Sequence, residues 1–191
     1  MLQQVRQNIL RTLWQVYRQN MPEIQILAEA LSAKDISIFP LDHFAVIDLP
    51  GRNTGIPQLS QIFSMLGFVK RGQAYLADKQ NEFLWMAETN AETKLAAAVL
   101  PQVVVADFRL DEMPVEVKKI IEKYAALASP PPFAEIEALL EKISLQDEQA
   151  EKRLCELVAN YFSGRDWPLP TVTEFTTVQA FNKLLAWVLI F

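Results

Sequence analysis

The 191-residue chain is 51% hydrophobic and 21% charged, with a formal net charge of −5 at pH 7. This composition is typical of a folded globular protein and excludes extended disorder. The acidic balance gives no electrostatic reason for a nucleic-acid or anionic-membrane partner, and no apolar stretch is long enough to span a bilayer. A single cysteine, Cys155, excludes an internal disulfide and predicts a reducing, cytoplasmic location.

Apolar residues spaced three and four apart predict helices, whereas short runs rich in β-branched and aromatic residues predict strands. In chain order this pattern predicts helices over 2–19 and 22–33, a strand over 44–49, a helix over 56–66, a hairpin within 68–86 with its turn at 78–81, and a strand over 100–108. Thr54 is expected to cap the helix that begins at residue 56, and Gly67 is expected to end it.

From Met113 onward the pattern is helical. The predicted helices run over 114–128, 133–143 and 147–163, and from Thr173 towards Leu185. The predicted fold class is α+β, with one βαβββ module between N-terminal helices and a helical C-terminal part. The predicted domains are N-terminal helices over 1–35, a βαβββ module over 36–112 that carries His43, and a helical segment over 113–191 that leads into a second module.

His43 is the only histidine of the chain and begins the first predicted strand. A lone histidine on a strand is more often structural than a metal ligand. The adjacent Asp42 points to the opposite face of a regular strand, so it cannot share an ion with His43. If the first and fourth strands lie side by side, Asp107 is the best carboxylate candidate within these residues. One histidine and one carboxylate still fall short of the three protein ligands that iron, manganese or zinc usually takes.

Other residues have both a structural and a functional interpretation. Tyr75 and Trp85 are expected to face each other across the hairpin, as core packing or as the wall of a substrate site. Cys155 lies within a helical pattern and is expected to be a buried, inert thiol. The segment 164–167 is expected to be a helix stop and a turn, in which Arg165 and Asp166 form either an ion pair or an anion site.

Four stretches resemble the 2-oxoadipate dioxygenase/decarboxylase family, also called hydroxyglutarate synthase. They are DHFAVIDLPG, TGIPQLSQIFSMLGF, GQAYLADKQNEFLWMAE and LPQVVVADFRL, and the likeness continues through YFSGRDWPLPT and NKLLAWVL. The most specific part is Asp-His-x-Ala at the start of the βαβββ unit. The chain is most similar to the short bacterial branch, whose members are often labelled as uncharacterised proteins or hydrolases, and its fold is expected to be related to the vicinal-oxygen-chelate (glyoxalase-like) proteins.

The resemblance implies one non-haem Fe(II) held by two histidines and one glutamate. His43 matches the first histidine, and the second histidine and the glutamate are expected beyond residue 191. The implied substrates are a small 2-oxo acid and O₂, with no nucleic-acid or membrane partner. Because the chain stops in the apolar run LLAWVLIF, the expectation is an N-terminal portion of a two-module enzyme, or a short member, that binds metal weakly and is inactive by itself.

One position departs from the family pattern. Many members carry an arginine four residues after the histidine, where it is positioned to bind a substrate carboxylate, and this chain has Ile47 there. Arg52, Arg71 or Arg109 is a candidate replacement, or the substrate differs. The candidate substrate pocket consists of Ile47, Tyr75, Trp85, Asp107 and Arg109.

Three functions are therefore open. The first is Fe(II)-dependent oxidative decarboxylation of a 2-oxo acid in the full-length protein, of the type that converts 2-oxoadipate to 2-hydroxyglutarate. The second is another vicinal-oxygen-chelate metalloenzyme, an isomerase or a lyase. The third is a non-catalytic structural or binding domain in which His43 is only packed.

Overall fold

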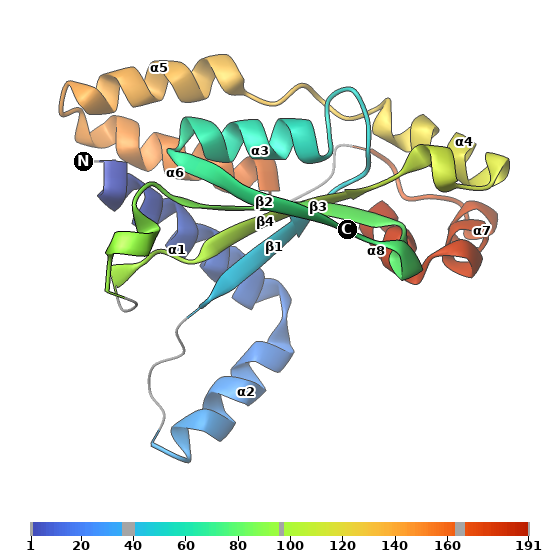
Figure 1. Cartoon of the computed structure of the whole chain (residues 1–191), viewed down its shortest axis with the longest axis horizontal. Coiled ribbons are helices and arrows are strands. Elements are labelled where there is room, and N and C mark those ends of the chain that lie inside the picture. Colours follow the sequence, from blue (N-terminus) through green and yellow to red (C-terminus); the bar gives the residue numbers. More distant parts are fainter. Residues whose placement is uncertain (1, 36–40, 96–97, 163–166, 191) are drawn as a thin grey trace. The chain divides into compact units, whose positions relative to one another are not determined.

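The computed structural model describes residues 2–35, 41–95, 98–162 and 167–190 (Figure 1). The strands are β1 (His43–Ile47), β2 (Phe68–Leu76), β3 (Asn81–Glu88) and β4 (Gln102–Phe108). The helices are α1 (Leu2–Asn20), α2 (Pro22–Ser32), α3 (Ile56–Met65), α4 (Val115–Ala125), α5 (Phe133–Ser144), α6 (Glu148–Phe162), α7 (Val172–Phe181) and α8 (Lys183–Ile190). The chain is thus a mixed α+β protein with the strand order of a βαβββ unit, as predicted.

The described residues form two compact units, and each unit is built from two segments of the sequence. One unit contains α1, α2, α5 and α6, within Met1–Asp42 and Pro132–Ser163. In it α6 packs against both α1 and α5. The other unit contains the sheet with α3, α4, α7 and α8, within His43–Pro131 and Gly164–Phe191. The division of the sequence into 1–35, 36–112 and 113–191 stays a prediction about domains.

The four strands form one sheet in the order β1-β4-β3-β2. The first strand lies next to β4 and parallel to it, and His43 is paired with Gln102 in that register. The neighbours β3 and β4, and β2 and β3, are antiparallel. A register shift between Lys70 and Gly72 leaves Arg71 at a β-bulge. The β2–β3 hairpin is closed by the short 3₁₀ turn Ala77–Lys79, which starts one residue before the predicted turn.

Paired residues on adjacent strands point to the same side of a sheet, and successive residues alternate between its sides. We call one side the His43 face, and its side chains are those of His43, Ala45, Ile47, Val69, Gly72, Ala74, Leu76, Asn81, Phe83, Trp85, Ala87, Gln102, Val104, Ala106 and Phe108. We call the other side the α3 face, and its side chains are those of Phe44, Val46, Phe68, Lys70, Gln73, Tyr75, Glu82, Leu84, Met86, Glu88, Val103, Val105 and Asp107.

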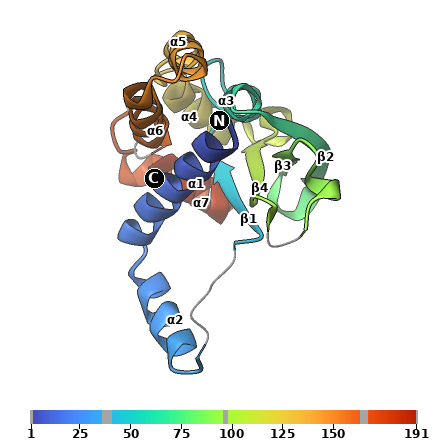
Figure 2. The same ribbon diagram turned by 90° about the vertical axis from the view of Figure 1, so that its left-hand side faces the viewer.

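The helix α3 covers the α3 face. Both views show this helix lying along the sheet (Figures 1 and 2). Its buried Phe63 makes edge contacts with Phe44 of β1 and Phe68 of β2, with ring centroids 6.0 Å apart in each pair. Gly67 follows the helix with φ of 85°, a left-handed conformation that glycine adopts at little cost, so its predicted role as the helix stop is confirmed.

A hydrophobic cluster joins α4, α7 and α8 to the ends of β1 and β4 through residues such as Ile121, Leu185 and Phe108. The N-terminus of α7 is held by a capping box in which Thr171 and Glu174 bond each other's backbone N–H groups. The Tyr124 hydroxyl of α4 also donates to Glu174, at 2.9 Å.

The last predicted helix is wrong in one respect, because Asn182 breaks it into α7 and α8. The Asn182 backbone is extended, with φ of −150° and ψ of 113°. Its buried side chain donates to the carbonyl of Lys79, at the hairpin turn, and its Oδ1 accepts from the N–H of Leu185 at 3.1 Å. The asparagine therefore stops one helix and caps the next.

Candidate functional site

His43 stands at the first position of β1 with an exposed side chain. Its strand neighbour on the same face is Ala45, which is also exposed and carries only a methyl group. Across the parallel ladder it is paired with Gln102, whose side chain is exposed too. The imidazole thus lies on an accessible and uncrowded part of the sheet, at the edge strand.

The described residues provide one donor for a transition metal at this place. Among them, no group of three or more His, Cys, Asp or Glu side chains is arranged to hold an ion. The sequence contains a single histidine. An exposed imidazole is a suitable ligand for iron or zinc, and it is the donor that the described residues offer at this place.

Asp107 does not complete that site. Its strand position is five residues beyond Gln102, the partner of His43, which corresponds to roughly 16 Å along the strand. It also lies on the α3 face, opposite to His43. The structure therefore separates the two groups that the sequence pairs as possible ligands of one ion.

The Asp107 carboxylate instead caps α3. Its Oδ2 accepts a hydrogen bond from the backbone N–H of Ile56 at 2.9 Å. A Cβ added to Gly55, whose φ is 87°, would lie 2.7 Å from the same oxygen, so the glycine permits this close approach. The expected Thr54 cap is wrong, because the cap residue is Gly55 and the buried Thr54 hydroxyl has no hydrogen-bond partner in the described structure.

Burial raises the pKa of Asp107 to about 6. The hydrogen bond from Ile56 lowers the pKa, but the negative charges of Glu82 and Asp48 raise it further. Loss of solvent destabilises a carboxylate more than one backbone N–H donor stabilises it here. This carboxyl group therefore changes its charge under mildly acidic conditions.

Tyr75 and Arg109 also lie on the side of α3. The Tyr75 hydroxyl donates to the Glu112 carboxylate, and the Arg109 guanidinium lies 3.7 Å from the centroid of the Tyr75 ring. Arg109 forms ion pairs with Glu82 at 3.4 Å and with Glu112 at 3.1 Å. Two carboxylates already neutralise this cation, which makes it a poor candidate for binding a substrate carboxylate on the His43 face.

Trp85 lies on the His43 face, where it is paired with Gly72 of β2. A Cβ added to Gly72 would lie 2.2 Å from the indole, so the ring rests directly on the glycine backbone. Phe83 is a tilted neighbour, with ring centroids 6.3 Å apart. Because Tyr75 is paired with Glu82 on the α3 face, the expectation that Tyr75 and Trp85 face each other is wrong.

Ile47 shares the His43 face and is half-buried against the hydrophobic cluster that contains Phe108. The candidate pocket residues therefore divide into two groups. Ile47 and Trp85 accompany His43, whereas Tyr75, Asp107 and Arg109 lie on the other side of the sheet. The residue closest to His43 by register, Gln102, was not foreseen, and the start of the fourth strand is the only sequence signal for it.

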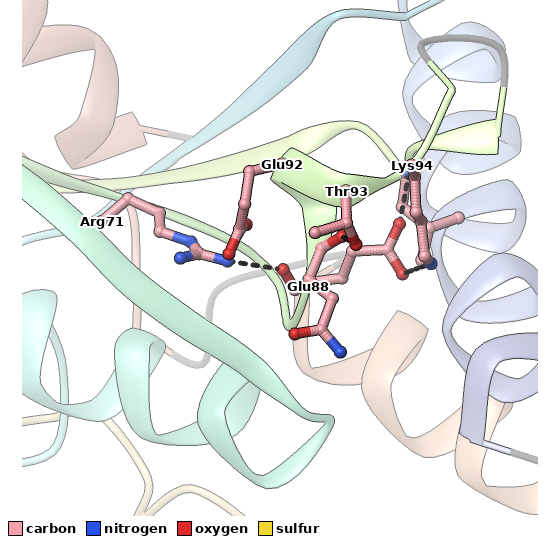
Figure 3. A network of polar contacts seen from close by, with 7 residues as sticks. Arg71, Glu88, Glu92, Thr93 and Lys94 are labelled. Carbon is pink, nitrogen blue, oxygen red and sulfur yellow. Dashed lines mark hydrogen bonds and ion pairs between the residues drawn. The ribbon is translucent and has the colours of Figure 1, made fainter.

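A buried carboxylate, Glu88, was also missed by the sequence reasoning (Figure 3). It is fully buried at the end of β3, where it forms an ion pair with Lys94 and accepts from the N–H of Leu100 at 2.9 Å. Its backbone carbonyl accepts from Arg71 at 2.9 Å, and Arg71 pairs with Glu92 at 3.1 Å. These contacts link the end of β3 to residues of the connection that leads to β4. The positive charge of Arg71 is paired with Glu92.

Cys155 is half-buried on α6, and burial with nearby Glu151 and Glu156 raises the pKa of its thiol to about 11. The thiol is therefore protonated and unreactive at neutral pH. The predicted turn at Arg165 and Asp166 lies outside the described residues.

No helix of the described chain has the length and apolar character needed to cross a membrane.

Known structures with the same fold include a glyoxalase superfamily protein from Ralstonia eutropha JMP134, which matches with a TM-score of 0.79 and 16% identity over 94% of this chain and 57% of its own. Hydroxyglutarate synthase from Oryza sativa, solved with 2-oxoadipate, matches with a TM-score of 0.72 and 18% sequence identity. The match covers 99% of this chain and 55% of that protein. Hydroxyglutarate synthase from Pseudomonas putida, also solved with 2-oxoadipate, matches with a TM-score of 0.71 and 14% sequence identity. The match covers 100% of this chain and 47% of that protein.

The chain thus spans about half the length of the structures it matches. At these identities the likeness concerns the fold. Among curated proteins no sequence match was found. The sequence model of the 2-oxoadipate dioxygenase/decarboxylase family matches residues 9–191, nearly the whole chain. The chain therefore belongs to the 2-oxoadipate dioxygenase/decarboxylase family.

Proposed function

We propose that this chain contributes one face of the active site of an Fe(II)-dependent enzyme that oxidatively decarboxylates a 2-oxo acid. The observation that carries the proposal is the exposed imidazole of His43 on an accessible sheet face, within a chain that belongs to this family. A histidine placed there for packing would be expected among buried neighbours, whereas Ala45 and Gln102 beside it are exposed.

In this proposal His43 is one of three protein ligands. Two histidines and one carboxylate suit a non-haem Fe(II) centre, because they leave positions open for a substrate and O₂. Since the sequence contains one histidine, the second histidine comes from outside these 191 residues. When bound, the metal supplies a Lewis acid and a redox centre for O₂.

The overall reaction is balanced by one molecule of O₂. The bond between C1 and C2 of the 2-oxo acid breaks and C1 leaves as CO₂. One oxygen atom of O₂ completes a new carboxylate at C2, and the other is inserted into a C–H bond at C3 as a hydroxyl group. The product is a 2-hydroxy acid that is one carbon shorter, as in the conversion of 2-oxoadipate to 2-hydroxyglutarate. Both oxygen atoms are fully reduced by the four electrons from the C–C and C–H bonds.

The His43 face contributes space and an apolar surface to this chemistry. The methyl side chain of Ala45 leaves room beside the imidazole for a bound substrate. Trp85 and Phe83 form an aromatic surface on the same face. An apolar surface favours closure of the site against water, which protects a reactive oxygen species from side reactions.

The test uses the full-length protein, loaded with Fe(II) under anaerobic conditions. We expect His43→Ala to lose at least about 90% of the bound iron and all CO₂ release from a 2-oxo acid. The matched control is Gln73→Ala, which removes an exposed polar side chain from the α3 face of the same sheet and should retain both. Iron that stays bound in the His43→Ala protein would disprove the proposed role.

The 191-residue chain by itself provides a second measurement. With one ligand from this chain, we expect weak iron binding and no turnover. Robust CO₂ release by these residues alone would contradict a site that needs further ligands.

A further inference from the structure

We propose that Gln102 binds the substrate at this site, and that its side-chain amide donates a hydrogen bond to the carboxylate beside the 2-oxo group. The inference rests on the proposed function and adds a second residue of this chain to the site. It concerns the part of the substrate that all 2-oxo acids share. It follows from the strand register, from the side chains around His43 and from the contacts that fix the start of β4.

Gln102 is the partner of His43 in the parallel pairing of β1 and β4. Each of the two is the first residue of its strand, and both side chains are exposed. Neighbouring strands lie about 4.8 Å apart, and paired residues point to the same side of the sheet. The amide and the imidazole therefore leave the sheet side by side. A substrate held next to His43 lies within reach of the amide.

The amide of Gln102 is a hydrogen-bond donor in apolar surroundings. The next side chains on this face of β1 and β4 are the methyl group of Ala45 and the isopropyl group of Val104, which neither donate nor accept. A glutamine amide has two N–H donors and one carbonyl acceptor. Within the described ranges of the chain, the Gln102 amide has no hydrogen-bond partner. Its donors are thus available to a ligand.

The amide suits the substrate carboxylate better than it suits the metal. A carboxylate only accepts hydrogen bonds, and the bonds that it accepts are strong because it is charged. An amide stabilises this anion without adding a net charge. Amide oxygens are ligands of hard cations such as Ca²⁺, whereas a non-haem iron centre takes imidazole and carboxylate. In this proposal Gln102 therefore acts on the substrate, and His43 acts on the metal.

The backbone that carries Gln102 is fixed by buried contacts. Two residues earlier, the N–H of Leu100 donates to the fully buried Glu88 carboxylate at 2.9 Å. Glu88 also forms an ion pair with Lys94, which lies beside it in Figure 3. Pro101 follows Leu100, and its ring restricts φ. The start of β4 is thereby held to the end of β3, which reduces the conformational freedom that is lost when Gln102 binds a ligand.

The test uses the full-length protein, loaded with Fe(II) under anaerobic conditions. Calorimetric titration with 2-oxoadipate measures Kd without turnover, and the iron content is measured on the same samples. Gln102→Leu keeps a side chain of similar size and removes the donors, so we expect Kd to rise about tenfold with the iron content unchanged. The matched control is Gln73→Leu, which changes an exposed glutamine of the α3 face and should keep the Kd of the native protein.

A second variant changes the chemistry of the side chain and keeps its shape. Gln102→Glu replaces the N–H donors with a carboxylate that repels the substrate carboxylate. We expect Kd to rise about a hundredfold, more than in Gln102→Leu. If Gln102→Glu binds 2-oxoadipate more tightly than Gln102→Leu does, the residue is not a donor to an anion and the inference is overturned.

A second probe tests which part of the substrate Gln102 contacts. 2-Oxohexanoate has the same 2-oxo carboxylate as 2-oxoadipate and a methyl group in place of the remote carboxylate. Because the proposed hydrogen bond is to the shared group, the rise in Kd for Gln102→Leu should be equal for the two acids to within about twofold. A rise that is confined to 2-oxoadipate would assign Gln102 to the remote carboxylate and overturn the inference.

The outcomes separate this inference from the proposed function. If the native protein binds iron and 2-oxoadipate, and Gln102→Leu binds 2-oxoadipate as tightly, the role of Gln102 is wrong and the proposed function stands. If Gln102→Leu loses iron together with 2-oxoadipate, the residue belongs to the metal site and its role is again wrong. If the native protein binds no iron, or releases no CO₂ from either acid, the proposed function fails and this inference fails with it.

Discussion

The two faces of the sheet use their polar side chains in opposite ways. The α3 face contains more polar side chains, and its prominent ones each have a structural partner. Asp107 caps α3, Glu88 binds Lys94, and Tyr75 binds Glu112. The His43 face has few polar groups, and its imidazole is exposed.

This difference shows how burial decides the role of a carboxylate. A charged group that is buried under a helix needs a partner, because the free energy of burying an unpaired charge is large compared with the net stability of a fold. The acidic residues of the strands are therefore committed to holding the α3 face together. The imidazole of His43, in contrast, lies exposed at the start of the edge strand β1. Replacing the buried acidic groups of the α3 face should accordingly affect stability, whereas replacing His43 should affect the proposed chemistry.

The largest effect on stability is expected at Glu88. Replacing it with alanine leaves the Leu100 N–H and the Lys94 ammonium without their buried acceptor. We expect Glu88→Ala to lower the free energy of unfolding by about 3 kcal/mol, as measured by urea denaturation. The matched control is Glu92→Ala, which removes an exposed partner of Arg71 and should cost about 0.5 kcal/mol or less. Equal losses in the two variants would contradict a structural division between buried and exposed carboxylates.

A smaller loss is expected from Gly72 on the His43 face. An added methyl group overlaps the Trp85 indole, so Gly72→Ala should cost about 2 kcal/mol in unfolding free energy. The double variant Gly72→Ala with Trp85→Leu removes the overlap, and a double-mutant cycle should show coupling of at least about 1 kcal/mol. Iron content should stay unchanged, because β2 and β1 are opposite edges of the sheet. Additive effects of the two changes would show that the indole does not rest on Gly72.

Much of this fold follows from local sequence patterns. Apolar residues recur every second position in the strands and every third or fourth position in the helices, which is why these elements were predicted. Gly67 ends α3 as expected. The break at Asn182 was not predictable, because its cause is a contact with Lys79, 103 residues away in the sequence. An asparagine within an apolar helical run gives no local sign of such a partner.

The candidate site was predictable only in part. The motif around His43 indicates a ligand, but assigning the other residues needs the strand register. A hairpin loop of four residues pairs odd-numbered with even-numbered positions, so Tyr75 faces Glu82 and cannot share a side with Trp85. Asp107 was assigned to His43 because the sequence does not show that His43 is paired with Gln102.

The smallest effect, and the one of opposite sign, is expected at Asp107. Its folded-state pKa of about 6 lies above the ordinary value of 3.8. Between these two values the folded protein binds a proton that the unfolded chain does not bind. Stability from this group is therefore present at low pH and is lost as the pH rises towards 6 and above.

Replacing Asp107 with asparagine removes the charge that burial disfavours but keeps an oxygen for the Ile56 N–H. We expect Asp107→Asn to raise the free energy of unfolding by about 1 kcal/mol at pH 8 and to change it little at pH 4, as measured by denaturation across that range. The control Asp78→Asn changes an exposed carboxylate in the hairpin turn and should leave the profile as it is. A variant less stable than the native chain at pH 8 would mean that the charge itself stabilises the N-terminus of α3.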